Sequence, residues 1–376
     1  MKNKVENILI TACFCGFLLI MLLCYLFVPK ESFSQQEKRY LAEKPVFTWK
    51  SLLSGDLGEQ IEDYLSDHIP GRNFYVGLNA YSDLVMGRQV TADVRLLEGE
   101  RLAEAPVAWN RLTVEKNMKA INDFSEQLSR EVHLMIVPSA GWASESGRVR
   151  WLDLFSREEY PDARYIRDIY SMAGEKVLTM DVTEIMSGRE DYYYRTDHHW
   201  NSRGAYEAYR YCMELFERNF VSEDAFSVET VLGFHGSTYT RSGLWMVPAE
   251  SLELWQSDSP LSVTNGESDE IHTGVFYRNR LDEADKYTVY LDGNHSIVRI
   301  ENPEQKGNGK LLVIRDSYSN SLGCFLAESY ETVVLVDLRY YKKPVSELCE
   351  QEMFTDILIC YSIGNFLTDT NLVWLR

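Results

Sequence analysis

The C-terminal third of the chain alternates short, uniformly apolar segments with segments of helical spacing, and this alternation restricts the fold more than any other feature. The apolar segments are Leu311–Ile314, Val333–Val336 and Ile357–Tyr361, and the helical patterns lie at Ser319–Glu328 and Val345–Glu352. A strand without polar alternation is covered on both faces, which is typical of parallel sheets with helical crossovers. The sequence therefore predicts an α/β fold with a central parallel sheet.

The same alternation is present earlier in the chain. Helical patterns are expected at residues 112–130 and Tyr165–Ala173, and buried strands at Val132–Val137 and Val177–Val182. Residues from 219 to about 305 interrupt it with turn-forming residues, short β-like runs and scattered aromatic residues. We expect this part to be a β-rich insertion into the α/β domain.

A polar loop, Tyr194–Asn201, contains Asp197 two residues before His199. An aspartate in this position can orient the imidazole so that its far nitrogen removes a proton from a hydroxyl group. We predict that this hydroxyl belongs to Ser317, which lies between the strand Leu311–Ile314 and a helical pattern. A strand-to-helix turn exposes such a side chain and places backbone N–H groups beside it for an oxyanion. The expectation is a Ser-His-Asp triad.

The Asp197, His198 and His199 cluster has two other interpretations. It could bind a metal ion, but adjacent histidines in an extended loop point apart, and no further His or Cys lies at a customary zinc spacing. It could also be structural, with Asp197 capping the following helix and both histidines buried. We expect no metal and no cofactor, and we assign His198 to a structural or substrate-facing position.

Four blocks of sequence resemble the bacterial DHHW family, which is similar to the alginate O-acetylation proteins of the SGNH hydrolase superfamily. The blocks are Thr196–Trp200, Arg315–Ser319, Val336–Tyr341 and Tyr361–Phe366. The resemblance covers most of the chain from about Ser32 and implies an SGNH-like, flavodoxin-like three-layer sandwich. The family pattern Asp-x-His-Trp maps onto Asp197, His199 and Trp200, and Ser317 is the nucleophile by the same resemblance. Here the serine follows the Asp-His pair, which reverses the order in ordinary SGNH hydrolases.

The resemblance also implies a function, an extracytoplasmic O-acetyltransferase that modifies a cell-surface or secreted polysaccharide through an acyl-serine. Outside the cell there is no acetyl-CoA, so acyl groups must cross the membrane. By analogy with the alginate system, a polytopic membrane-bound O-acyltransferase would be the partner that supplies them. Two alternatives remain open. One is a carbohydrate acetylesterase, and the other is a non-catalytic carbohydrate-binding or scaffolding component of an envelope assembly.

Several residues near these blocks could contact a substrate. Arg195 and Arg315 could bind an anionic group or form ordinary salt bridges, and Trp200, with Trp142 and Trp245, could stack on sugar rings or belong to the core.

Three further residues are candidates for the substrate or the oxyanion. Tyr318 follows the predicted nucleophile, and Gly293 and Asn294 lie in a turn whose groups could donate hydrogen bonds to an oxyanion. A plain hairpin turn would use the same two residues.

An uninterrupted apolar run from Ile8 to Val28 follows Lys2 and Lys4. A bilayer core of about 30 Å needs roughly 20 such residues, whereas the apolar part of a cleaved signal peptide has about 7 to 15. The run therefore predicts a single transmembrane anchor. The basic residues before it favour an inside N-terminus, which gives a cytoplasmic tail at 1–7 and an extracytoplasmic C-terminal domain in the cell membrane.

The rest of the chain divides into two parts by pattern. Residues 29–110 are expected to form a membrane-proximal linker with helical and short β segments, and residues 111–376 the catalytic domain. The net charge of −19 argues against nucleic acid or an anionic membrane surface as a partner. Cys212 and Cys360 fall at apolar positions and are expected to be buried free thiols.

Overall fold

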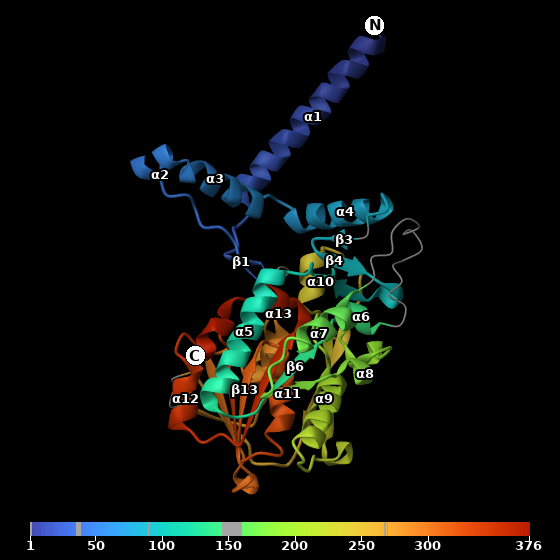
Figure 1. Cartoon of the computed structure of the whole chain (residues 1–376). Coiled ribbons are helices and arrows are strands. Elements are labelled where there is room, and N and C mark those ends of the chain that lie inside the picture. The colour runs from blue at the N-terminus through green and yellow to red at the C-terminus, as the bar shows by residue number, and fades with distance from the viewer. Residues whose placement is uncertain (1, 35–38, 89, 145–159, 267, 269) are drawn as a thin grey trace. The chain divides into compact units, whose positions relative to one another are not determined.

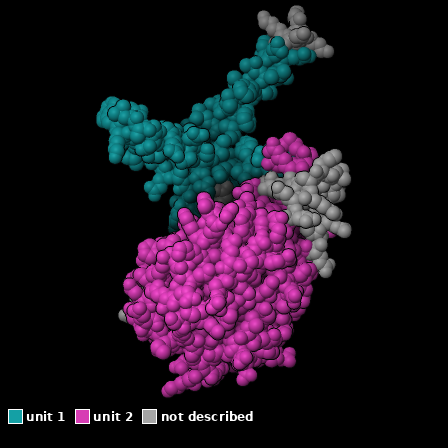
Figure 2. Space-filling view, viewed as in Figure 1, with its two compact units in different colours: residues 1–82 teal, residues 83–376 magenta. Residues whose placement is uncertain are grey.

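The computed structural model divides the chain into two compact units, residues 1–82 and residues 83–376, which are coloured separately in Figure 2. The residues it describes are 2–34, 39–88, 90–144, 160–266, 268 and 270–376.

The first unit begins with a long apolar helix, α1 (Lys2–Phe27). Within it, Val5–Phe27 is long and apolar enough to cross a membrane, and none of that stretch is buried. Two of its helices are joined by a turn that contains Pro70 and Gly71. The elements after α1 are β1 (Phe33–Ser34), β2 (Arg39–Tyr40), α2 (Trp49–Ser54), α3 (Asp56–Asp67) and α4 (Arg72–Val85), whose last turn extends into the second unit.

The second unit is built on an eight-stranded sheet in the order β11-β10-β12-β14-β13-β15-β6-β7. Five neighbouring strands are parallel, which confirms the predicted central parallel sheet. These are β14 (Thr332–Val336), β13 (Lys310–Arg315), β15 (Asp356–Ser362), β6 (Val132–Val137) and β7 (Val177–Met180). β13 and β15 are paired in parallel, so their carboxyl ends lie side by side. The candidate site is built at these two ends.

The predicted β-rich insertion is confirmed, and it extends the main sheet. Its strand β12 (Ile297–Glu301) pairs antiparallel with β14, and β10 (Ser262–Asn265) and β11 (Ile271–Thr273) continue the antiparallel edge. A separate hairpin is formed by β8 (Ser227–Phe234) and β9 (Glu250–Gln256). The sequence did not predict this pairing, because alternation within a strand does not identify the partner strand.

Helices cover both faces of the sheet and make the predicted three-layer sandwich (Figure 1). Along β13, Leu311 and Val313 pack into the core that includes α9 and α11, whereas Leu312 and Ile314 pack into the core that includes α5, α7, α12 and α13. Each fully buried side chain of this kind stabilises the fold by about 1.5–3 kcal/mol. The bounds are α5 (Arg111–Leu128), α6 (Ala140–Ala143), α7 (Asp162–Tyr170), α8 (Thr183–Met186), α9 (Ser202–Leu215), α10 (Ser237–Ser242), α11 (Ser319–Leu326), α12 (Val345–Gln351) and α13 (Ile363–Thr368).

The remaining elements are small. The short strands predicted near residues 89–103 form a three-stranded sheet of β3 (Val90–Thr91), β4 (Val94–Leu96) and β5 (Leu102–Glu104). Cys212 and Cys360 are buried free thiols, as expected. The 3₁₀ helices are η1 (Glu98–Glu100), η2 (Glu190–Tyr192), η3 (Glu223–Ala225), η4 (Arg278–Asp282), η5 (Lys286–Val289), η6 (Pro303–Gln305) and η7 (Asn371–Leu375).

Candidate active site

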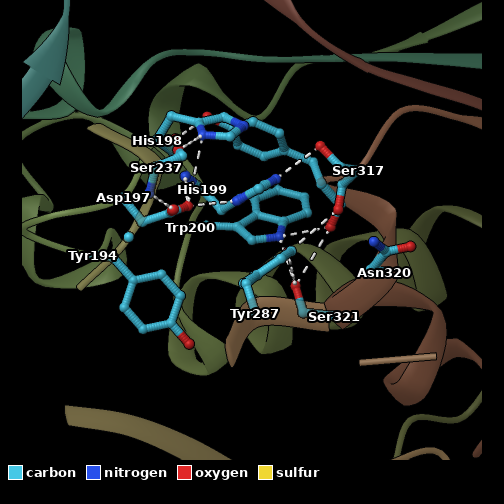
Figure 3. Close-up of polar contacts among 12 residues, drawn as sticks. Tyr194, Asp197, His198, His199, Trp200, Ser237, Tyr287, Ser317, Asn320 and Ser321 are labelled. Carbon is cyan, nitrogen blue, oxygen red and sulfur yellow. Dashed lines mark hydrogen bonds and ion pairs between the residues drawn. The ribbon is translucent and has the colours of Figure 1, made fainter. Parts of the chain in front are cut away.

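Asp197, His199 and Ser317 lie in one hydrogen-bonded chain (Figure 3). Asp197 Oδ1 is 2.5 Å from His199 Nδ1, and His199 Nε2 is 2.8 Å from Ser317 Oγ. The three residues are only 1%, 4% and 7% exposed. In this arrangement the carboxylate orients the imidazole, and the far nitrogen is placed to accept the proton of the hydroxyl group.

Ser317 lies on the predicted strand-to-helix turn, between β13, which ends at Arg315, and α11, which begins at Ser319. The side chain is not in the open, which corrects the expectation for such a turn. The rings of Tyr287 and Tyr318 surround the histidine that it contacts, so only a small part of the serine remains accessible.

Asp316 holds the turn that carries Ser317. Its Oδ1 accepts the N–H of Tyr318 at 3.0 Å. Its Oδ2 accepts both the N–H and the hydroxyl of Ser362, at 2.8 and 2.7 Å, and the amide of Asn365 at 2.8 Å. Because Ser362 ends β15, these bonds attach the turn that carries Ser317 to the neighbouring strand.

The loop that carries Asp197 is held by the insertion. Asp197 Oδ2 accepts the N–H of Ser237 at 2.6 Å, and Gly236 N–H donates to Thr196 Oγ1 at 3.1 Å. Glu250 on β9 accepts the N–H and the hydroxyl of Thr196, at 2.6 and 2.5 Å. Burial raises the pKa of Glu250. The position of the Asp197 carboxylate therefore depends on contacts of this loop with residues 40 to 54 positions later in the chain.

Gly236→Ala is expected to lower the rate of ester cleavage by about 10²-fold, because misplacing a catalytic group by roughly 1 Å costs this much. A Cβ at position 236 would lie 2.2 Å from Asp197 Cβ and 2.4 Å from its Oδ2, so the aspartate must move. The measurement is the turnover of an activated acetyl ester. Gly58→Ala is the control, since no atom lies within 4 Å of its added Cβ. Normal turnover in Gly236→Ala would show that Asp197 need not stay in place.

Two tyrosines restrict the His199 imidazole. The Tyr287 ring stacks on it with a centroid distance of 3.9 Å and an interplanar angle of 5°, and its hydroxyl donates to the Ser317 carbonyl at 3.3 Å. Burial raises the pKa of Tyr287 well above 10, so the hydroxyl stays a donor. The Tyr318 ring lies 5.0 Å from the same imidazole. Together they limit rotation of His199 away from Ser317.

His198 lies beside His199, with the ring centroids 3.8 Å apart, and its Nδ1 is 2.5 Å from Ser237 Oγ. Potential ligand atoms of Asp197, His198 and His199 lie within 4.8 Å of one another. However, Asp197 and Ser317 occupy both nitrogens of His199. A metal ion bound there would have to break one of these hydrogen bonds, so the donor set fits a proton-transfer chain better than a metal centre.

Acidification is expected to destabilise the protein partly through His198. Burial, and then the neighbouring His199, lower the pKa of His198 from 6.5. The unfolded chain therefore takes up a proton that the folded chain resists, and stability falls as the pH drops through about 6.5. The measurement is the melting temperature between pH 7.5 and 5.5. Burial also lowers the pKa of His133, so this residue acts in the same direction. His198→Gln should therefore reduce the pH dependence of the melting temperature without abolishing it. A melting temperature that varies with pH as strongly in His198→Gln as in the wild type would contradict a contribution of His198.

Trp200 is not where substrate contact would require it, and Arg195 forms a hydrogen bond within the protein. Trp200 is fully buried, and its Nε1–H donates to the Tyr318 carbonyl and to Ser321 Oγ, both at 3.0 Å. The structure assigns it to the core instead of a sugar-stacking position. Arg195 donates to the carbonyl of Pro248 at 2.9 Å, which makes it a structural contact of the loop.

Two of the three residues predicted to bind an oxyanion already donate their backbone N–H groups to acceptors within the protein. The N–H of Tyr318 donates to Asp316, and the N–H of Gly293 donates to the Tyr290 carbonyl at 3.0 Å. Neither N–H is therefore free for an oxyanion. Asn294 contacts the helix that follows Ser317, because its Oδ1 accepts the side-chain amide of Asn320 in the first turn of α11 at 3.1 Å.

The salt-bridge interpretation fits Arg315 better than binding of an anionic substrate. Arg315 is completely buried, donates to Asn294 Oδ1 at 2.8 Å and lies 3.8 Å from Asp337 Oδ2. Burial lowers its pKa. Trp142 and Trp245 are half-buried, and Trp142 packs against the core.

Sequence reasoning missed several residues of the site. Gly236, Ser237 and Tyr287 come from the insertion, where no periodic pattern distinguishes them from ordinary turn and aromatic residues. Ser362 and Asn365 had a signal, because they belong to the Tyr361–Phe366 block of the family resemblance. Their function as partners of Asp316 could not be read from that block.

Comparisons with known proteins agree with this architecture. A family model described as DHHW protein matches residues 149–336, which is half of the chain. A DHHW family protein from Eubacterium siraeum has a similar structure, with a TM-score of 0.65 and 20% identity over 76% of this chain and 95% of that one. No match to the sequence is found among curated proteins.

Two further solved structures are similar. Bacillus cereus PatB1 has a TM-score of 0.60 and 20% identity over 74% of this chain and 98% of that one, and it has also been solved with a sulfonyl adduct. The O-acetyltransferase domain of Pseudomonas putida AlgJ has a TM-score of 0.45 and 13% identity over 73% and 92%. The family match covers the Asp-His loop and the turn that carries Ser317, and by this match the chain belongs to the DHHW protein family.

Proposed function

We propose that this protein is an extracytoplasmic O-acetyltransferase that modifies a cell-surface or secreted polysaccharide through an acetyl-serine intermediate on Ser317. The observation that carries the proposal is the hydrogen-bonded chain from Asp197 through His199 to Ser317. That geometry supports acyl transfer through a serine nucleophile. The resemblance of the DHHW family to the alginate O-acetylation proteins supports acetyl as the group transferred and a polysaccharide as the acceptor.

The reaction has two halves. His199 Nε2 accepts the proton of Ser317 while Oγ attacks the carbonyl carbon of the acetyl donor, and Asp197 stabilises the imidazolium without being protonated. His199 then returns the proton to the leaving oxygen, and acetyl-Ser317 remains. In the second half, an acceptor hydroxyl gives its proton to His199 and attacks the ester, and Ser317 leaves and recovers the proton. Water as the acceptor would make the same site an acetylesterase.

The first unit supports a location at the membrane. Val5–Phe27 has the length and composition of a single span, and Lys2 and Lys4 before it favour an inside N-terminus. The second unit, residues 83–376, would then catalyse the reaction outside the cytoplasm. Since acetyl groups would have to be passed across the membrane, a polytopic membrane-bound O-acyltransferase is the expected donor.

The test is to trap the acyl-enzyme on the full-length protein in detergent. A small activated acetyl ester should add one acetyl group to the peptide that contains Ser317, detected by mass spectrometry. A sulfonyl fluoride is a second reagent, and prior acetylation should protect Ser317 from it. If the folded protein reacts with neither, the proposal fails and the non-catalytic, carbohydrate-binding alternative is favoured.

The acceptor then distinguishes the transferase from the esterase. The acetylated protein is mixed with oligosaccharides, and acetylated sugar and free acetate are measured together. Acetyl groups on the sugar support the transferase. Release of acetate alone, at a rate that no oligosaccharide changes, would identify an acetylesterase.

A further inference from the structure

A polar pocket of about 380 Å³ lies beside the triad. Its lining combines acidic, amide, hydroxyl and imidazole groups with a single cation. The residues with polar side chains are Asp93, Glu104, His198, Arg241, Ser362, Asn365 and Thr368. Such a mixture of hydrogen-bond donors and acceptors, beside the apolar side chains of Ala105, Pro106 and Val107, suits a ligand that has both hydroxyl groups and C–H faces, as a sugar has.

The pocket is lined by residues that contact the Asp-His loop and the turn that carries Ser317, while Asp197, His199 and Ser317 are not themselves in its lining. On one side, His198 lines it and contacts the His199 ring. On the other side, Ser362 and Asn365 line it and both bind Asp316, the residue before the nucleophile. A molecule in the pocket is therefore next to the residues that position Ser317 and His199.

The charges of the pocket select among possible ligands. Arg241 is the one cationic side chain in the lining, and it forms an ion pair with Glu104. Asp93 adds a second carboxylate, so the pocket as a whole is acidic, in a chain whose net charge is −19. An anionic polymer would meet repulsion at the pocket and at long range. Carboxylates do, however, accept hydrogen bonds well from the hydroxyls of a neutral sugar.

His198 presents a polar edge to the same pocket. Its Nδ1 is taken by Ser237, while Nε2 forms no hydrogen bond within the described residues. Burial and the neighbouring His199 lower the pKa of His198, so the ring stays neutral near pH 7. A neutral imidazole can donate or accept at Nε2, according to its tautomer, and so can bind a hydroxyl.

From these observations we infer that the pocket lined by Asp93, Glu104, His198 and Arg241 holds the acceptor, a neutral hydroxyl-bearing sugar and not a uronate or phosphate polymer. The inference rests on the proposed function, because it assigns the second half of that reaction. The acceptor hydroxyl loses its proton to His199 Nε2, a new bond joins its oxygen to the acetyl carbon, and the bond from that carbon to Ser317 Oγ breaks.

The test separates the two half-reactions of the full-length protein in detergent. Formation of acetyl-Ser317 from 4-nitrophenyl acetate is followed first. Transfer is then measured to neutral hexasaccharides of glucose, mannose and N-acetylglucosamine, and to hexamers of glucuronate and mannuronate. Acceptors in the first group should be acetylated and those in the second group should not.

Two conservative variants probe the pocket itself. Asp93→Asn and Glu104→Gln keep the size of each side chain, and each should lower the ratio of transfer to hydrolysis by about ten- to a hundredfold, the loss expected for a hydrogen bond to a charged group. Glu126→Gln is the matched control, because Glu126 is an exposed carboxylate on α5. A wild-type ratio in both pocket variants would overturn the assignment.

The other outcomes are equally decisive. Preferred transfer to the uronates, or transfer to no sugar from a fully acetylated enzyme, would overturn the neutral-acceptor inference and leave the serine chemistry standing. A protein that never forms acetyl-Ser317 would instead contradict the proposed function.

Discussion

Ser317→Ala is expected to lower the rate of acetyl-ester cleavage by about 10⁴-fold or more, because a serine triad without its nucleophile retains only the catalysis supplied by binding and oxyanion groups. The hydroxyl is the end of the chain in which His199 Nε2 lies 2.8 Å from Ser317 Oγ. The measurement is the release of 4-nitrophenol by the full-length protein in detergent, with the mass of the intact protein as a second readout.

Two comparisons make this prediction specific. His199→Ala should lower the rate of ester cleavage about as much as Ser317→Ala does. The double variant should be no slower than either single variant, because the effects of replacing residues that act as a unit are not additive. Ser251→Ala removes an exposed serine of β9 and should change nothing. A Ser317→Ala protein that still cleaves the ester at more than a tenth of the normal rate would show that another group is the nucleophile.

Asp316→Ala is expected to reduce the free energy of unfolding by about 3 kcal/mol or more, because it leaves several buried donors without an acceptor. The carboxylate is 1% exposed and accepts four hydrogen bonds, from Tyr318, Ser362 and Asn365. The loss should lower the melting temperature by roughly 6 °C or more. It should also reduce turnover at a temperature where the variant is folded, since the turn that carries Ser317 loses its attachment to β15.

The matched control for Asp316 is Asp168→Ala. Asp168 is an exposed carboxylate on α7, so its replacement should change the free energy of unfolding by no more than about 0.5 kcal/mol. Asp316→Asn keeps the shape but points an amide donor at other donors, so it should also destabilise the protein. If Asp316→Asn and Asp316→Ala both melted at the normal temperature, the hydrogen bonds to Asp316 would not be holding the turn.

The regular part of the fold was predictable because its signals are local. Uniform apolar runs such as Leu311–Ile314 and Ile357–Tyr361 are explained by burial on both faces, and the predicted strands are present as β13 and β15. The position of Ser317 followed from the same pattern, since a residue after a parallel strand lies at the carboxyl edge of the sheet. Its contact with His199 joins residues 118 positions apart.

The parts that were missed depend on partners far away in the sequence. Position 236 must be glycine because Asp197 lies against its backbone and leaves no room for a Cβ. Tyr287 belongs to the site because its ring stacks on that of His199. Nothing in the residues around either position indicates such a neighbour. Trp200 could not be assigned from the sequence for a related reason. An indole next to Asp197 and His199 can face a ligand or the core, and in the structure it is buried and donates to the Tyr318 carbonyl.

The sequence by itself determined the α/β class, the apolar N-terminal helix, and the residue types Asp197, His199 and Ser317 with the order in which they occur. These follow from periodicity, length and chemical type, which are properties of short segments. Only the tertiary structure decided that the insertion extends the sheet, that Asp316 attaches the turn that carries Ser317 to β15, and that an acidic pocket lies beside His198. Those features arise where distant segments meet, and packing and charge between them are not encoded in any one segment.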